Sequence, residues 1–107
     1  MADEERRGAE RQDDGASCDL FIEIQDGFMF HRISPALVDY SETGAQFSAY
    51  SDSHIKIGRT VIIHSCAGSP PKKHIIEAEI VWAYDGGGKI NFGCQFLHVQ
   101  NITPLFA

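Results

Sequence analysis

Short segments in which apolar and polar residues alternate, separated by turn residues, constrain the fold of this chain more than any other feature. In the longest of them, residues 74–84, Glu77 and Glu79 fall on one face. The opposite face carries Ile76, Ala78, Ile80, Trp82 and Tyr84. A period of two residues is typical of a β-strand with one buried face. The alternation therefore predicts a strand in which Trp82 and Tyr84 share the face of Ile80.

Five further segments have the same extended character. They are residues 20–25, 28–38, 45–50, 60–66 and 90–98. Turn residues separate them, among them Asp26-Gly27, Gly58 and Gly86-Gly87-Gly88, and Pro35 indicates a bend or a sheet edge within 28–38. In the last segment Phe92, Cys94 and Phe96 share one face. Six or seven strands with turns every 8–12 residues or so are typical of an antiparallel sandwich or barrel.

The two ends of the chain differ in composition from this region. Residues 1–16 are charged and, apart from Met1, contain no large apolar side chain, which predicts a flexible arm ahead of one domain at 17–107. Thr103 and Pro104 allow at most one helical turn in the tail. The acidic N-terminus does not resemble a signal peptide, and no apolar run reaches the length of about 20 residues that a membrane span needs. We therefore expect a cytoplasmic protein without a membrane span.

Charge and cysteine content exclude several classes of partner. The formal net charge is −6 with a pI near 5.2, which argues against DNA or RNA as a general partner but not against a small anionic ligand. Three cysteines without a CxxC pair imply neither a disulfide framework nor a zinc site, so we expect reduced thiols. The histidines at 54, 64, 74 and 98 have no metal-ligand spacing. No metal and no cofactor are therefore expected.

No set of residues suggests catalysis. Ser41 and Ser65 are not part of a GxSxG nucleophile motif. Cys94 lies between two phenylalanines and is expected to be a small buried residue. Glu77 and Glu79 are expected on a solvated strand face. We therefore expect a binding protein and not an enzyme.

Two short motifs carry the binding chemistry. Residues 6–11 read RRxxxR, with Arg6, Arg7 and Arg11, and residues 39–44 read DxSxxG. Arginine side chains bind phosphates and guanine edges bidentately. A turn that directs the oxygens of Asp39 and Ser41 outward can accept hydrogen bonds from guanine N1–H and N2–H₂. Taken alone, the first motif is better explained by a solvated tail of mixed charge. Taken alone, the second is better explained by an ordinary tight turn whose glycine allows a positive φ.

In this order, ahead of a series of strands, the two motifs resemble those of the PilZ domain family. Ile57-Gly58, Glu79-Ile80-Val81-Trp82 and Gly93-Cys94-Gln95-Phe96 are similar to further segments of that family, so the resemblance covers residues 5–100 or so. It implies an all-β fold, a six-stranded antiparallel β-barrel. It also implies that the arginine arm folds over one mouth of the barrel when cyclic di-GMP binds.

The resemblance also implies roles for individual residues. Arg7 and Arg11 would contact phosphates and guanines, with help from Arg6. Asp39 and Ser41 would bond a guanine edge, and Gly44 would shape the turn. Trp82 lies where some members have an aromatic residue near the ligand, although packing in the core is the interpretation that we favour for it.

The function implied is that of a cyclic di-GMP receptor and effector switch in bacterial signalling, for example in motility, biofilm or polysaccharide control. An unidentified downstream protein would read the bound state. Two alternatives stay open at this point. One is a PilZ-fold adaptor that binds proteins and no nucleotide, and the other is an unrelated small β-barrel that binds a metabolite or metal.

Overall fold

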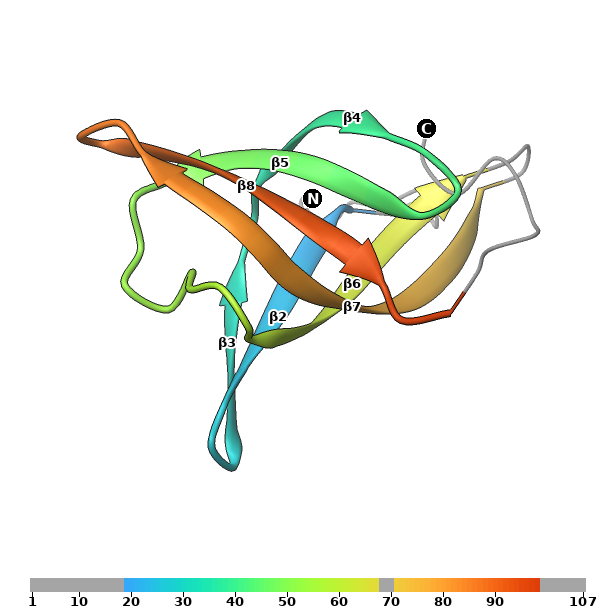
Figure 1. Ribbon diagram of the computed structural model, residues 1–107. Helices are drawn as coiled ribbons and strands as arrows, with labels where there is room; N and C mark the ends of the chain where they lie inside the picture. Colours follow the sequence, from blue (N-terminus) through green and yellow to red (C-terminus); the bar gives the residue numbers. More distant parts are fainter. Residues whose placement is uncertain (1–18, 68–70, 99–107) are drawn as a thin grey trace, which may run out of the picture.

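The computed structural model describes residues 19–67 and 71–98, in which every regular element is a β-strand. The strands are β2 (Phe21–Asp26), β3 (Met29–Ile33), β4 (Ala36–Tyr40), β5 (Gly44–Tyr50), β6 (Thr60–Ala67), β7 (Lys72–Asp85) and β8 (Lys89–Phe96) (Figure 1). The all-β prediction is confirmed. The expected strands at 45–50, 60–66, 74–84 and 90–98 correspond to β5, β6, β7 and β8.

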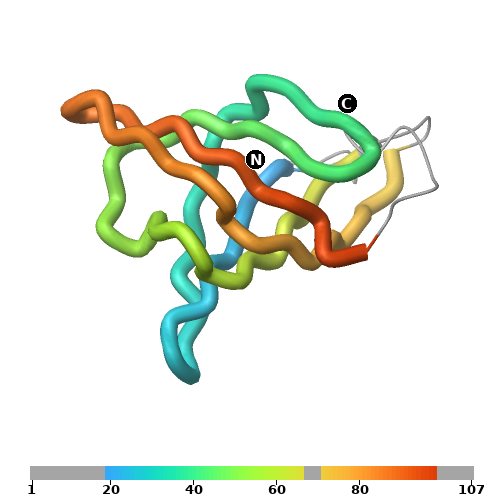
Figure 2. Tube along the Cα trace, in the orientation of Figure 1, coloured from blue at the N-terminus to red at the C-terminus, as the bar shows by residue number. Residues whose placement is uncertain are grey.

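The strands form one antiparallel sheet in the order β3-β2-β6-β7-β8-β5-β4. It contains seven strands, which agrees with the six or seven predicted from the pattern and is one more than in the barrel that the resemblance implied. Ser34 and Pro35 divide the segment 28–38 into β3 and β4. These two strands are the edges of the sheet, yet two residues connect them. The end of β3 and the start of β4 therefore lie within about 11 Å of each other, and the sheet curls strongly (Figure 2). Between the described parts of β3 and β4 no ladder closes this curled sheet into the expected barrel.

The core fills the concave side of the curled sheet. It contains Ile22, Ile24, Ile33, Ala45, Phe47, Ile55, Val61, Ile63, Ile76, Ala78, Ile80, Ile90, Phe92, Cys94 and Phe96. The rings of Phe47 and Phe92 stack with centroids 5.5 Å apart, which ties β5 to β8. The buried face predicted for residues 90–98 is confirmed, because side chains two residues apart lie on the same side of a strand.

An extra residue in β7 changes this alternation. Ile80 pairs with Cys94 and Trp82 pairs with Gly93, so Val81 is a β-bulge. Beyond the bulge, side chains that would have pointed to the core point outward. Trp82 is 39% exposed and Tyr84 is 67% exposed. The expectation that both share the buried face of Ile80, and that Trp82 packs in the core, is therefore wrong.

A second bulge lies in β4. Leu37 pairs with Phe47 and Asp39 pairs with Gln46, which leaves Val38 as the extra residue. Leu37 packs against the core. Without the bulge Asp39 would follow it to the same side. The bulge instead places the Asp39 carboxylate on the outer face of the sheet.

The cysteines differ in state. Cys94 is a free thiol, and burial raises its pKa to about 12, which leaves it protonated and unreactive. Cys66 is disulfide-bonded, so the expectation of reduced cysteines is wrong there.

No helix in the described residues is long and apolar enough to span a bilayer. Several predictions concern residues that the structure does not describe. These are the arm at 1–16, the boundary at 16/17, Cys18 and the tail at 101–107, so the domain division stays a prediction.

Candidate ligand-binding site

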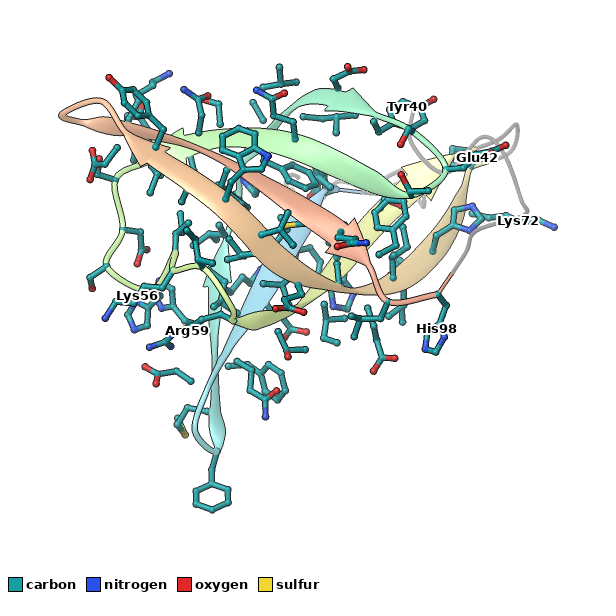
Figure 3. The ribbon with its side chains drawn as sticks, in the orientation of Figure 1. Tyr40, Glu42, Lys56, Arg59, Lys72 and His98 are labelled. Atoms are coloured by element: carbon teal, nitrogen blue, oxygen red, sulfur yellow. The ribbon has the colours of Figure 1, made fainter. Side chains whose placement is uncertain are left out.

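A surface depression of about 240 Å³ lies across the outer face of four adjacent strands, β4, β5, β8 and β7. Its lining consists of Asp39, Tyr40, Ser41, Gly44, Ala45, Gln46, Val81, Trp82, Gly93 and Cys94. Figure 3 labels Tyr40 and Glu42 at the hairpin that forms one end of it. The structure thus brings together four of the predicted site residues, Asp39, Ser41, Gly44 and Trp82. The other three, Arg6, Arg7 and Arg11, lie outside the described residues.

The DxSxxG motif forms the hairpin between β4 and β5. The Ser41 N–H donates to the Gly44 carbonyl (2.8 Å), and the Thr43 N–H donates to Ser41 Oγ (3.2 Å). Ser41 Oγ also lies 3.1 Å from Thr43 Oγ1, at hydrogen-bond distance. The Ser41 hydroxyl therefore holds the turn, as the ordinary-turn interpretation expects.

Asp39 presents an available acceptor to the depression. Its Oδ1 accepts a hydrogen bond from the Tyr40 N–H (2.8 Å). No described residue donates a hydrogen bond to its Oδ2. Since the bulge at Val38 turns this exposed side chain outward, the carboxylate can meet donors on a ligand. The interpretation of Asp39 as an outward-facing acceptor is consistent with this geometry.

Gly44 is required for a reason that the sequence did not reveal. The motif suggested a positive φ, but the described glycines with φ in that region are Gly27, Gly58, Gly87 and Gly88. A Cβ atom at residue 44 would instead collide with the carbonyl oxygen of Cys94 in β8. The backbone stays close there because the Phe96 N–H donates to the Thr43 carbonyl at 2.8 Å. Gly44 thus allows two backbones to approach closely at the floor of the depression.

Trp82 supplies an aromatic surface to the same depression. The five-membered ring of its indole lies over Gly93, so closely that a Cβ atom at residue 93 would collide with it. Trp82 and Gly93 are direct neighbours across β7 and β8. The bulge at Val81 therefore sets the tryptophan beside the DxSxxG hairpin. The lining by Tyr40, Gln46 and Val81 was not predicted, because it depends on how the strands pair and on where their bulges fall.

The described part of the site carries negative charge. Among its lining residues Asp39 alone has a formal charge. Six of the nine lysines and arginines of the chain lie in the described residues, and none of the six lines the depression. They are Arg32, Lys56, Arg59, Lys72, Lys73 and Lys89. An anionic ligand held here would need positive charge from elsewhere in the chain.

Comparison with known proteins identifies the family. The model of the PilZ domain matches residues 5–104, nearly the whole chain. No curated protein and no solved structure shows a significant match. The match includes both motifs and every described strand, and it agrees with the family suggested by the two motifs. The chain therefore belongs to the PilZ domain family.

Proposed function

We propose that this PilZ domain binds cyclic di-GMP in the depression between the DxSxxG hairpin and Trp82. The family is one of receptor domains for cyclic di-GMP and not of catalysts. One observation supports the proposal most: two bulges, in β4 and β7, turn Asp39 and Trp82 outward onto the same surface. β-Bulges are frequent next to functional sites, where they redirect a side chain.

Asp39 and Trp82 together suit a guanine base. The carboxylate accepts hydrogen bonds, and the Watson–Crick edge of guanine offers N1–H and N2–H₂ as donors. Stacking of a base on an aromatic side chain contributes about 1–3 kcal/mol. An indole beside a carboxylate can therefore hold a purine by its face and by its edge. Ser41 and Gly44 would shape the hairpin that positions Asp39.

The phosphates would be bound by Arg7 and Arg11, with Arg6 in support. None of the described lysines and arginines lines the depression. The remaining positive side chains are those of the RRxxxR motif, which the family match includes. Charge-assisted hydrogen bonds from arginine to phosphate contribute about 1.5–3 kcal/mol each.

This distribution of groups suits a switch. The sequence predicts residues 1–16 as a flexible arm, and ordering such an arm costs about 1–2 kcal/mol per residue in backbone entropy. Several arginine–phosphate bonds would offset that cost only while ligand is present. A downstream protein that recognises the ordered arm would then respond to the ligand concentration. No chemical step is required of any residue.

Fluorescence of Trp82 tests the location of the site. It is the only tryptophan of the chain, so emission reports on the depression alone. We expect cyclic di-GMP to change its intensity in a saturable way, because a stacked guanine alters the indole environment. GTP and cyclic mononucleotides should change it far less at equal concentration.

Calorimetry of the Trp82→Phe variant is the control, since phenylalanine keeps an aromatic face and removes the signal. We expect this variant to retain measurable binding. If wild-type protein binds cyclic di-GMP in the calorimeter with no change in emission, the ligand lies elsewhere. If neither method detects binding, the receptor proposal is wrong.

A further inference from the structure

Two histidines and an aspartate meet on a part of the molecule that the proposed ligand site does not use. They are His31 in β3 and Asp52 and His54 in the connection between β5 and β6. One nitrogen of each ring and one carboxylate oxygen lie within 4.8 Å of one another. Among residues 19–67 and 71–98, no other group of three histidine, cysteine or acidic side chains lies this close together.

Asp52 is the centre of this cluster. Its Oδ2 lies 2.8 Å from His31 Nε2, and its Oδ1 lies 2.8 Å from His54 Nδ1. The His54 N–H also donates to Oδ1 at 2.9 Å, which fixes the carboxylate relative to its own loop. Partial burial raises the pKa of Asp52, but the hydrogen bonds from His54 and His31 outweigh it and hold that pKa at about 2. The carboxylate is therefore an anion at neutral pH.

The two imidazoles are already placed together. Their rings stack with centroids 3.8 Å apart and 16° between the planes. The other nitrogen of His54, Nε2, lies 3.7 Å from Asp26 Oδ2. Arg59 in turn holds Asp26, with Nη1 and Oδ1 3.1 Å apart. A carboxylate behind the second nitrogen is the usual support of a metal-binding histidine, because it orients the ring.

We propose that His31, Asp52 and His54 form a binding site for a divalent cation of the zinc class. Two imidazole nitrogens and one carboxylate oxygen suit zinc, which such ligands hold at about 2.0–2.2 Å. Magnesium and calcium prefer sets made of oxygen alone. A water molecule completes four-coordination. The cation replaces the imidazole protons that now bond Asp52, and the stacked rings tilt so that their lone pairs converge.

Such an ion would join two separate parts of the fold. It would connect β3, at one edge of the sheet, to the loop that carries the buried Ile55. This site shares no residue with the depression and lies beyond the other end of β5. Figure 3 shows Lys56 and Arg59 on the side of the molecule opposite Tyr40 and Glu42. Zinc binding at this cluster can therefore be tested independently of nucleotide binding.

Calorimetric titration with Zn²⁺, on the full chain without a histidine tag, tests the proposal. We expect about one equivalent to bind, and Mg²⁺ at the same concentration to give no comparable binding. His31→Gln and His54→Gln should each weaken zinc binding at least tenfold or so, because each removes one of three ligands. His31→Gln is the cleaner variant, because His31 belongs to β3, whereas the His54 ring bonds Asp52 within its own loop.

His64→Gln is the matched control. His64 Nε2 lies 2.8 Å from Glu23 Oε1, so it is a partly exposed histidine–carboxylate pair outside the three-residue cluster. Its loss should leave zinc affinity unchanged. In wild-type protein, zinc should shift the imidazole ¹⁵N resonances of His31 and His54 and not those of His64. Absence of zinc binding, equal binding of Mg²⁺, wild-type affinity in His31→Gln, or an equal loss in His64→Gln would each overturn the proposal.

Discussion

Replacing Gly44 with alanine is expected to lower the free energy of unfolding by about 3 kcal/mol, near the upper end of the usual cost of overpacking. The added methyl group would collide with the carbonyl oxygen of Cys94. That oxygen cannot easily move away, because β8 is paired on both sides, with β5 and with β7. At about 4–8 °C per kcal/mol for a domain of this size, the melting temperature should fall by about 12 °C or more.

Gly86→Ala is the control for this substitution. A Cβ atom at residue 86 would lie 3.6 Å from the Lys89 carbonyl oxygen and 3.7 Å from Tyr84 Cε2, which are ordinary contacts. The melting temperature of Gly86→Ala should therefore stay close to that of the wild type, while that of Gly44→Ala falls. If Gly44→Ala melts like the wild type, or Gly86→Ala loses as much, close approach to Cys94 is not the reason for glycine in this motif.

Alanine at Arg7 or at Arg11 is expected to weaken cyclic di-GMP binding by about 1.5–3 kcal/mol, or ten- to a hundredfold. Each substitution would remove the charge-assisted hydrogen bonds to phosphate that we propose for that arginine, and no described lysine or arginine lines the depression to replace them. The melting temperature of the ligand-free protein should change little, because the sequence predicts that this arm contributes nothing to the core. Calorimetric titration paired with thermal melts measures both effects.

Arg32→Ala is the matched control for the arginine variants. The Arg32 guanidinium lies 3.7 Å above the Phe21 ring, and Arg32 does not line the depression. Removing it alters the net charge by the same amount, so it should leave nucleotide binding nearly unchanged. Wild-type affinity in Arg7→Ala, or an equal loss in Arg32→Ala, would show that the arm does not bind the phosphates specifically.

Local alternation predicted most of the strands but not where Trp82 would point. The period of two correctly assigned Ile76, Ala78 and Ile80 to the core, as well as Phe92 and Cys94. It failed beyond Val81, because a bulge adds one residue and reverses every later side chain. No feature of the sequence of residues 79–84 predicts a bulge at Val81. The position opposite Trp82 must be small, and this requirement becomes visible only once β8 is paired with β7.

Only part of the candidate site was predicted, because some of its contacts are local and others join residues far apart in the chain. DxSxxG correctly predicted a turn with Asp39 exposed, because aspartate, serine and glycine form turns through local contacts. The reason for Gly44 lies in Cys94, fifty residues later, and could not be deduced locally. Likewise His31 is twenty-one residues away from Asp52, a spacing that matches no metal motif. Both features depend on contacts between residues that are distant in the sequence, so the local pattern does not reveal them.

Calorimetric titration of the full chain with cyclic di-GMP, beside GTP and a cyclic mononucleotide, tests the central claim most directly. The depression offers an aromatic face, a carboxylate and a hairpin. In the proposed complex the arm would add three arginines, and the site would then engage two guanines and two phosphates at once. We predict saturable binding of cyclic di-GMP and much weaker binding of the other nucleotides. No heat with any of them, or equal affinity for GTP and cyclic di-GMP, would contradict the assignment of this chain as a cyclic di-GMP receptor.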